Sequence, residues 1–187
     1  FPVPRRWGVV AAGHKETSRA ARVLLEEGGN AFDAAVAVSA ALAVVEPYGS
    51  GLGGGGFWLL HRNSDGLQLM VDGRDKAPMA AHRDLYPDDK GEVIPGASIN
   101  GPRAAGIPGV PAAMVHIAKN YCRLPLTKTL APAIQLAQKG FEVDKQYRRY
   151  AKIRLKTLQR FSDTAKIFLN NNALPELGYL LKQPDLA

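Results

Sequence analysis

A dense run of glycines constrains the fold of this 187-residue chain more than any other feature of its sequence. Six of the nine residues 49–57 are glycine, in the order Gly-Ser-Gly-Leu-Gly-Gly-Gly-Gly-Phe. Glycine loses more backbone entropy on folding than other residues, so such a run indicates positive φ angles or a backbone approached too closely for a Cβ atom. The run follows an apolar helical pattern over 31–45 and precedes an apolar strand pattern over 57–61.

The order of these elements argues against a phosphate-binding loop. Dinucleotide and P-loop motifs place their glycines after a strand and before a helix, so that phosphate meets the helix N-terminus. Here the glycines close a helix and open a strand, although Gly49, Gly51 and Gly54 formally fit G-x-G-x-x-G. No Gly-Lys-Ser/Thr follows. We therefore do not expect nucleotide binding.

The rest of the pattern predicts a helix-rich mixed domain. Asn30 is a suitable N-cap for the apolar helix, with Asp33 as its capping-box partner. Because few strands are visible, the inventory indicates part of a larger α/β domain whose other strands lie outside this chain. Residues 170–187 show no further element. The expected elements are a buried strand over 8–12, helices over 17–27, 31–45, 110–121, 127–139 and 144–161, and an antiparallel hairpin with strands 57–60 and 67–71.

The net charge of +7 is concentrated in one segment. From Lys139 to Lys166 the chain holds nine Lys and Arg against three Asp and Glu. This excess suits a nucleic-acid or anionic-surface patch. However, Tyr147, Ala151 and Leu155 recur at helical spacing, which favours the solvated face of an amphipathic helix. A salt-dependent mobility shift with DNA or RNA distinguishes the two interpretations.

Several common catalytic and metal motifs fail on spacing or context. The four histidines are scattered, and none forms the H-x-x-x-H or H-E-x-x-H pair of a helical zinc site. The acids of 88–92 lack the order of a calcium loop and predict a polar turn. Ser98 almost fits G-x-S-x-G but is followed by Ile-Asn-Gly-Pro, and Ser50 lacks the first glycine. The single cysteine, Cys122, is expected to be a buried small hydrophobe at a helix end.

Arg74 is the strongest candidate for a binding residue. It follows the second strand of the hairpin, within Asp-Gly-Arg-Asp-Lys-Ala-Pro over 72–78. Since the hairpin reverses direction, Phe57 and Arg74 come to the same edge of the sheet, beside the glycine run. An arginine there presents a planar fork to a carboxylate, which suggests recognition of a small anionic ligand. The alternative is a surface arginine paired with Asp72 or Asp75.

At these residues the sequence resembles the gamma-glutamyltranspeptidase family of N-terminal nucleophile hydrolases. The likeness runs in order through nearly the whole chain. Its motifs are Glu-Glu-Gly-Gly-Asn-Ala-Phe-Asp-Ala-Ala-Val-Ala over 26–37, Val-Glu-Pro over 45–47, the glycine run over 51–57, the arginine segment over 72–78, Gly-Ile-Pro-Gly-Val-Pro over 106–111 and Ala-Ile-Gln-Leu-Ala-Gln-Lys-Gly-Phe over 133–141.

The resemblance implies a fold and an activity. The fold class is α/β (α+β), a partial αββα sandwich that is helix-rich, with the antiparallel hairpin contributing to a sheet that the missing part completes. The activity is gamma-glutamyl transfer from glutathione-like compounds to water or an amino acceptor, without a cofactor. Arg74 is then the residue that binds the α-carboxylate of the donor. The resemblance also suggests a periplasmic or extracellular location, although residues 1–30 lack the pattern of a secretory signal.

The resemblance also indicates what this chain lacks. In that family the nucleophile is a threonine freed by self-cleavage, whose α-amine serves as base. Nothing in 1–187 resembles the start of that small subunit, and Thr17, Thr127, Thr129, Thr157 and Thr164 lie in helix or cap contexts. We therefore expect residues 1–187 to be a single incomplete domain with no catalytic residue and no metal site.

The expected partners are the remainder of the large subunit, the small catalytic subunit and a small gamma-glutamyl substrate. The isolated chain is expected to be inactive. Two alternatives stay open at this point. One is a cephalosporin or glutaryl acylase, or a poly-gamma-glutamate-cleaving relative, of the same fold. The other is a basic module that binds nucleic acid or an anionic surface, although we do not expect nucleic acid as a partner.

Overall fold

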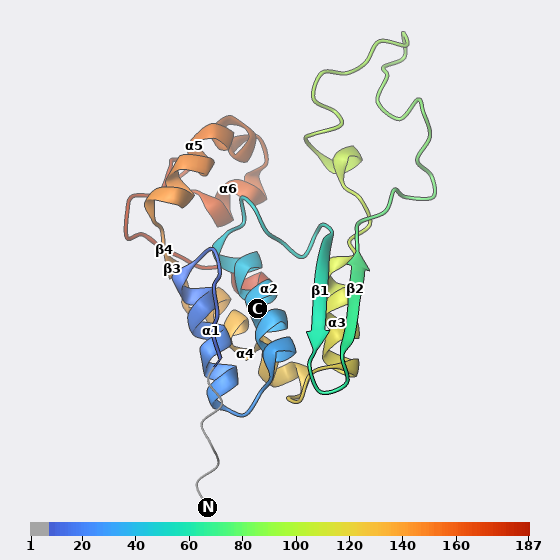
Figure 1. Ribbon diagram of the computed structural model, residues 1–187. Coiled ribbons are helices and arrows are strands. Elements are labelled where there is room, and N and C mark those ends of the chain that lie inside the picture. The colour runs from blue at the N-terminus through green and yellow to red at the C-terminus, as the bar shows by residue number, and fades with distance from the viewer. Residues whose placement is uncertain (1–7) are drawn as a thin grey trace, which may run out of the picture. The chain divides into compact units, whose positions relative to one another are not determined.

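A computed structural model describes residues 8–187 (Figure 1). These residues divide into two compact units, one made of 8–51 and 114–187 and the other of 52–113. The first unit holds most of the helices, and the second holds a hairpin and a long irregular excursion. Among the described residues, no helix combines the length and apolar character needed to cross a bilayer.

The first unit is built around helix α2, Ala31–Val45, which the sequence predicted with these bounds. Asn30 caps it: its side chain accepts hydrogen bonds from the N–H groups of Phe32 and Asp33, and the Asp33 carboxylate accepts one from Asn30 N. The predicted capping box is therefore confirmed. The helix is apolar on nearly all sides because other helices surround it, and Val36, Ala37 and Ala41 are fully buried.

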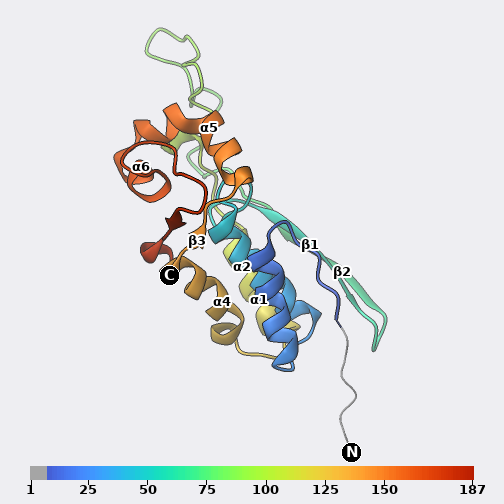
Figure 2. The ribbon, with the colours of Figure 1, turned by 90° about the vertical axis from the view of Figure 1, so that its left-hand side faces the viewer.

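Helices α1, Lys15–Glu26, and α4, Leu126–Lys139, pack beside α2 (Figures 1 and 2). Helix α1 begins two residues earlier than expected because His14 caps it: the imidazole Nδ1 accepts from Glu16 N at 3.2 Å. It ends before Gly28, whose φ of +91° suits glycine. Pro132 lies inside α4, at its seventh residue. Helix α3, Val110–Asn120, runs from the second unit into the first.

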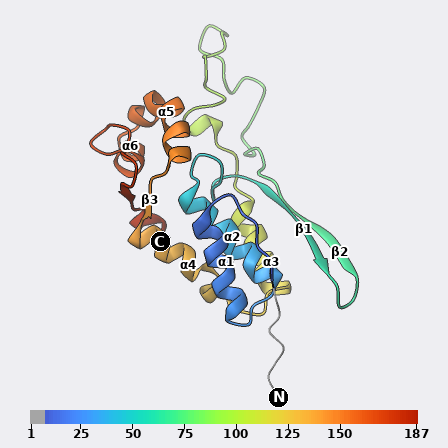
Figure 3. The same ribbon diagram turned by 60° about the vertical axis from the view of Figure 1, so that its left-hand side comes forward.

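Helices α5, Lys145–Arg160, and α6, Ser162–Phe168, pack against each other (Figure 3). Asp144 caps α5, its Oδ1 accepting from Tyr147 N at 2.7 Å. The buried Tyr147 hydroxyl donates to the carbonyl of Phe168 at 2.7 Å, which ties α5 to the end of α6. Burial, and to a smaller extent the nearby Tyr179, raises the pKa of this hydroxyl. It therefore stays protonated, and can donate, at any physiological pH.

Two sequence expectations about the first unit were wrong. Residues 8–12 form no strand, and Val9 is 98% exposed. A strand needs a partner for its backbone groups, and none of the described strands pairs with this segment. The C-terminal segment, in contrast, does contain closing elements. Strand β4, Leu180–Leu181, pairs antiparallel with β3, Phe141–Glu142, and a short 3₁₀ helix η2, Pro184–Leu186, comes after it.

Gln183 explains how so short a closing segment is held. Its side-chain amide donates to the carbonyl of Val44 at 2.8 Å, and its backbone N–H donates to the carbonyl of Ala137 at 2.9 Å. The residue is buried, so both bonds are made away from water. A single glutamine therefore joins the ends of α2 and α4, an arrangement with no local sequence signal.

The second unit contains the predicted antiparallel hairpin. Strand β1 covers Gly56–Arg62 and β2 covers Leu67–Gly73, in a register that places Gly56 opposite Gly73 and Leu59 opposite Met70. After β2 the chain makes a long excursion, which contains a 3₁₀ turn η1, Pro102–Ala104, and an isolated antiparallel bridge between Pro87 and Val93. A pair of backbone bonds between Lys76 and Ile107, at 3.1 and 2.8 Å, closes the base of this excursion.

Candidate functional site

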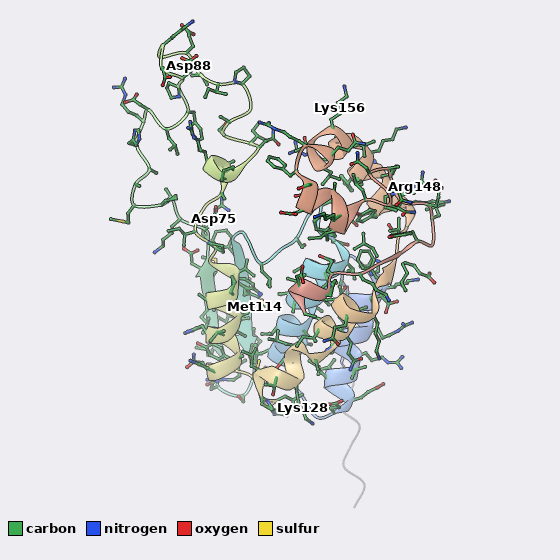
Figure 4. The ribbon with its side chains drawn as sticks, turned by 180° about the vertical axis from the view of Figure 1, so that it is seen from behind. Asp75, Asp88, Met114, Lys128, Arg148 and Lys156 are labelled. Atoms are coloured by element: carbon green, nitrogen blue, oxygen red, sulfur yellow. The ribbon has the colours of Figure 1, made fainter. Side chains whose placement is uncertain are left out.

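The candidate site is the end of the hairpin where the glycine run, Arg74 and the returning chain meet. Because Gly56 pairs with Gly73, the residues just before β1 lie beside those just after β2. This confirms the expectation that the glycine run and Arg74 converge. In Figure 4, Asp75 lies at the base of the long excursion and Asp88 at its far tip. We call the meeting point, formed by 53–56, 73–76 and 106–110, the glycine junction.

Two glycines of the junction allow backbones to touch, and a third, Gly73, leaves room for neighbouring side chains. A Cβ on Gly55 would lie 2.4 Å from Asp75 N, and one on Gly109 would lie 2.2 Å from the carbonyl oxygen of Gly73. One on Gly73 would lie 2.8 Å from the Cβ of Ala113 in the first turn of α3. Such distances are too short for any side chain, so close approach is the reason for glycine here. The sequence predicted close approach or positive φ for the run; close approach is confirmed at Gly55, whereas Gly49, Gly53 and Gly54 show neither feature, and it was not predicted for Gly73 or Gly109.

The carbonyl of Gly54 fixes the returning chain. It accepts hydrogen bonds from the N–H groups of Gly109 and Val110, at 3.1 and 3.2 Å. The run thus supplies an acceptor at the start of α3, where the helix N–H groups lack intrahelical partners. A glycine pair on the far side of a long excursion, at 106 and 109, is the sequence signal that would have identified this contact.

The junction gives a matched pair of glycine substitutions. Gly109→Ala is expected to destabilise the hairpin by about 2–3 kcal/mol, because its methyl group meets backbone atoms that have no room to move. Gly53→Ala is the control, since a Cβ there meets nothing within 4 Å. Amide hydrogen exchange of β1 and β2 measures the difference: protection should fall by about 30-fold or more in Gly109→Ala. Equal protection in both variants would remove the close-approach explanation.

Arg74 projects from this junction with its side chain 62% exposed. Its backbone N–H donates to Asp72 Oδ1 at 2.9 Å, and its guanidinium Nη1 donates to Asp75 Oδ1. The ion pair with Asp75 that the sequence allowed as an alternative is therefore present, whereas Asp72 accepts from the backbone N–H of Arg74. The guanidinium carries five N–H groups, and the bond to Asp75 engages only its Nη1. The remaining edge can still bind a carboxylate in bidentate fashion.

The other residues considered from sequence have local structural roles. Ser98 lies exposed in a turn, and Asp88 Oδ1 accepts from the N–H groups of Lys90 and Glu92, as expected of a polar turn. The buried hydroxyls of Thr17 and Thr129 donate to carbonyls of His14 and Pro125. Within residues 8–187 no three His, Cys, Asp or Glu side chains gather in a way that would hold a metal ion.

Cys122 is poorly suited to nucleophilic chemistry. Burial, followed by the charge of Asp33 and a hydrogen bond with it, raises the pKa of the thiol to about 12. The thiolate is the reactive form, so its population at pH 8 falls by about a thousandfold relative to an ordinary thiol. We expect iodoacetamide to modify Cys122 far more slowly than a cysteine in a model peptide at pH 8. Modification at the peptide rate would contradict the raised pKa.

Helix α5 has the amphipathic arrangement expected from its sequence. Tyr147 and Ala151 are buried, whereas Lys152 and Lys156 are exposed, and Lys156 points away from the fold in Figure 4. The exposed aromatic ring of this face, Tyr150, is stacked on Tyr48 with centroids 4.8 Å apart. One face of the ring is therefore already covered, which weakens the case for base stacking by this helix.

The chain is similar to solved structures of one class of enzyme and matches the model of one protein family. The structure superposes on a crystal structure of Helicobacter pylori gamma-glutamyltranspeptidase with a TM-score of 0.91 and 35% identity, over 99% of this chain and 53% of that one. The fold is thus part of an N-terminal nucleophile hydrolase. The gamma-glutamyltranspeptidase family model matches residues 17–187, and the chain belongs to that family. The family expected from the sequence motifs is confirmed.

Two further similar proteins have different activities in their names. The chain is 45% identical over 141 residues to the glutathione hydrolase proenzyme of Pseudomonas aeruginosa, covering 75% of this chain and 25% of that protein. It also superposes on a cephalosporin acylase from Bacillus halodurans with a TM-score of 0.80 and 29% identity, over 98% of this chain and 36% of the acylase. The chain spans about a quarter to a third of the length of the curated relatives it matches.

Proposed function

We propose that this chain forms the donor-carboxylate site of an enzyme that transfers a gamma-glutamyl group from glutathione-like compounds to water or an amine. The observation that carries the proposal is the exposed Arg74 fork, held at the glycine junction in a member of this family. The names of the relatives as glutathione hydrolases support the substrate class. The term intact enzyme denotes the full-length protein to which residues 1–187 belong.

The proposed role of Arg74 is orientation. A gamma-glutamyl donor carries its α-carboxylate at the far end from the bond that is cleaved. A bidentate pair with the guanidinium fixes both the distance and the rotation of that end. A donor held in one geometry has already lost translational and rotational entropy on binding. Less entropy then has to be lost in reaching the transition state, which lowers the barrier of the chemical step. The junction assists because backbone contacts at Gly55 and Gly109 fix the segment that carries Arg74.

The proposed chemistry belongs to a threonine outside this chain. Its hydroxyl oxygen attacks the gamma-carbonyl carbon while its own α-amine takes the proton. Collapse of the tetrahedral intermediate breaks the amide bond, and the leaving amine receives that proton. Water or an acceptor amine then attacks the ester and frees the threonine. The partners of this chain are accordingly the rest of the large subunit and the small subunit, and the isolated chain is inactive.

The likeness to a cephalosporin acylase supports a second candidate, in which the acyl pocket accepts a side chain without an α-amino acid end. The test is a panel of amide donors with the intact enzyme: gamma-glutamyl-p-nitroanilide, glutaryl-p-nitroanilide and poly-gamma-glutamate. Preference for the first, with release accelerated by an acceptor dipeptide, supports the proposed function. Preference for the glutaryl donor would replace it by the acylase, and preference for the polymer would replace it by a poly-gamma-glutamate-cleaving enzyme.

A further inference from the structure

The carboxylate of Asp75 occupies a slot between two glycines. A Cβ on Gly55 would lie 2.6 Å from Asp75 Oδ1, and a Cβ on Gly106 would lie 2.9 Å from Asp75 Oδ2. Each oxygen of the carboxylate therefore lies where a side chain on one of these glycines would be. The Asp75 side chain is only 28% exposed, although Arg74 on one side and Lys76 on the other are both exposed.

The walls of this slot are fixed by backbone bonds. Lys76 and Ile107, next in sequence to Asp75 and Gly106, exchange two hydrogen bonds. On the other side, Gly54, next to Gly55, accepts from Gly109 and Val110. Three chain segments thus hold one carboxylate in place. The guanidinium of Arg74 binds this carboxylate at Oδ1.

A second arginine–aspartate pair in the same unit shows that the slot is specific. Arg83 and Asp84 are also adjacent in sequence and also form an ion pair, at 3.2 Å. Their side chains are 92% and 65% exposed, and no glycine backbone encloses Asp84 among the described residues. Exposed pairs of that kind contribute little and hold neither side chain in one place. The two pairs therefore share their chemistry but differ in how the acid is held.

We propose that Asp75 is the positioning residue for Arg74, and that Gly55 and Gly106 form the slot that holds its carboxylate. The inference rests on the proposed function. Arginine loses considerable rotamer freedom when a ligand immobilises it. An acid that is itself immobile restricts the guanidinium before the donor arrives, which lowers the cost of binding. Engagement of Nη1 by Asp75 leaves the remaining N–H groups of the fork for the α-carboxylate.

A competing role for Asp75 would change KM for the donor in the opposite direction. Asp75 is an anion beside a cation that must bind an anion, so a competing acid would weaken donor binding. If Asp75 acts as a competitor, its removal lowers KM for the donor. If it positions the fork, its removal raises KM.

The experiment uses the intact enzyme and two donors. Gamma-glutamyl-p-nitroanilide carries the α-carboxylate, and 4-aminobutyryl-p-nitroanilide lacks only that group. Asp75→Ala is expected to raise KM for the first donor by about 10-fold, with kcat changed less than about 3-fold. Asp75→Asn, which keeps an acceptor oxygen, should show a smaller increase. Neither variant should change kcat/KM for the second donor, which also shows that the enzyme remains folded. Asp84→Ala is the matched control and should match the wild type with both donors.

A double-mutant cycle separates failure of this inference from failure of the proposed function. If Asp75 acts through Arg74, Asp75→Ala adds nothing on an Arg74→Ala background. If Arg74→Ala leaves KM for the gamma-glutamyl donor unchanged, the proposed function fails and this inference fails with it. If Arg74→Ala raises that KM but Asp75→Ala leaves it unchanged or lowers it, the positioning role is overturned and the proposed function stands.

Discussion

Replacing Arg74 by alanine in the intact enzyme is expected to lower kcat/KM for gamma-glutamyl-p-nitroanilide by about 100-fold, mostly through KM. Hydrogen bonds to charged groups are worth about 1.5–3 kcal/mol each, and the exposed position of Arg74 keeps each of the two bonds of the bidentate pair near the lower end of that range, so their sum of about 3 kcal/mol corresponds to roughly 100-fold. The side chain is the exposed fork of the glycine junction, so its loss removes the contact without opening a core. Steady-state kinetics at several donor concentrations measures the effect.

Two variants control for charge and for general effects of arginine loss. Arg74→Lys keeps the positive charge but not the planar fork, so it should recover only part of the affinity. Arg83→Ala removes an exposed arginine from the excursion of the same unit and should behave as the wild type. Wild-type kinetics in Arg74→Ala would leave this chain without an assigned binding residue.

The second large effect concerns stability and lies at Asp33, in the first unit. The side chain is fully buried, and its carboxylate accepts hydrogen bonds from three backbone N–H groups. These belong to Asn30 at 2.7 Å, Arg123 at 3.1 Å and Leu124 at 3.0 Å. Asp33→Ala leaves all three donors without this acceptor, and we expect a loss of about 4 kcal/mol in the free energy of unfolding. Urea unfolding followed by the helical circular dichroism signal measures it.

Asp163→Ala is the matched control for Asp33→Ala. Asp163 is also an acid in the first turn of a helix, but its side chain is 90% exposed and paired with Lys166. Its removal should change the free energy of unfolding by less than about 0.5 kcal/mol. Asp33→Asn should fall between the two, since its amide retains one acceptor oxygen. A similar, small effect of Asp33→Ala and Asp163→Ala would show that the buried carboxylate is not what holds the loop before α4.

Local sequence signals predicted the elements that are determined locally. The bounds of α2 followed from Asn30, an uninterrupted apolar run and Pro47. The hairpin followed from two apolar runs around a turn, and its direction reversal placed Arg74 beside the glycine run. The basic face of α5 was correctly attributed to an amphipathic helix, because its apolar residues recur at helical spacing.

The features that the sequence did not predict depend on contacts between distant segments. Asp33 was assigned as a capping partner, yet it also binds two residues that come after α3, 90 and 91 positions away. Gln183 and the close contact of Gly109 with Gly73 are of the same kind. The predicted strand over 8–12 failed for the reverse reason: its apolar pattern was suitable, but none of the described strands lies where it would pair.

The candidate site shows the same division. The place of Arg74 at the end of a strand predicted its position beside the glycine run, and the family resemblance implied its binding role, whereas nothing in the sequence predicted the slot around Asp75. Gly55 and Gly106 are 51 positions apart, and neither signals a slot by itself. Only the closed base of the excursion brings both against one carboxylate. The family motifs over 51–57, 72–78 and 106–111 are the three segments that meet there.

The most direct test of the central proposal is a crystal structure of the intact enzyme with its hydrolysis product, glutamate, bound. We predict that the Arg74 guanidinium binds the α-carboxylate of glutamate through two N–H groups, at about 2.7–2.9 Å. Nη1 should still contact Asp75 in that complex. A glutamate whose α-carboxylate is bound by other residues, with Arg74 directed into solvent, would contradict the proposed role of this chain.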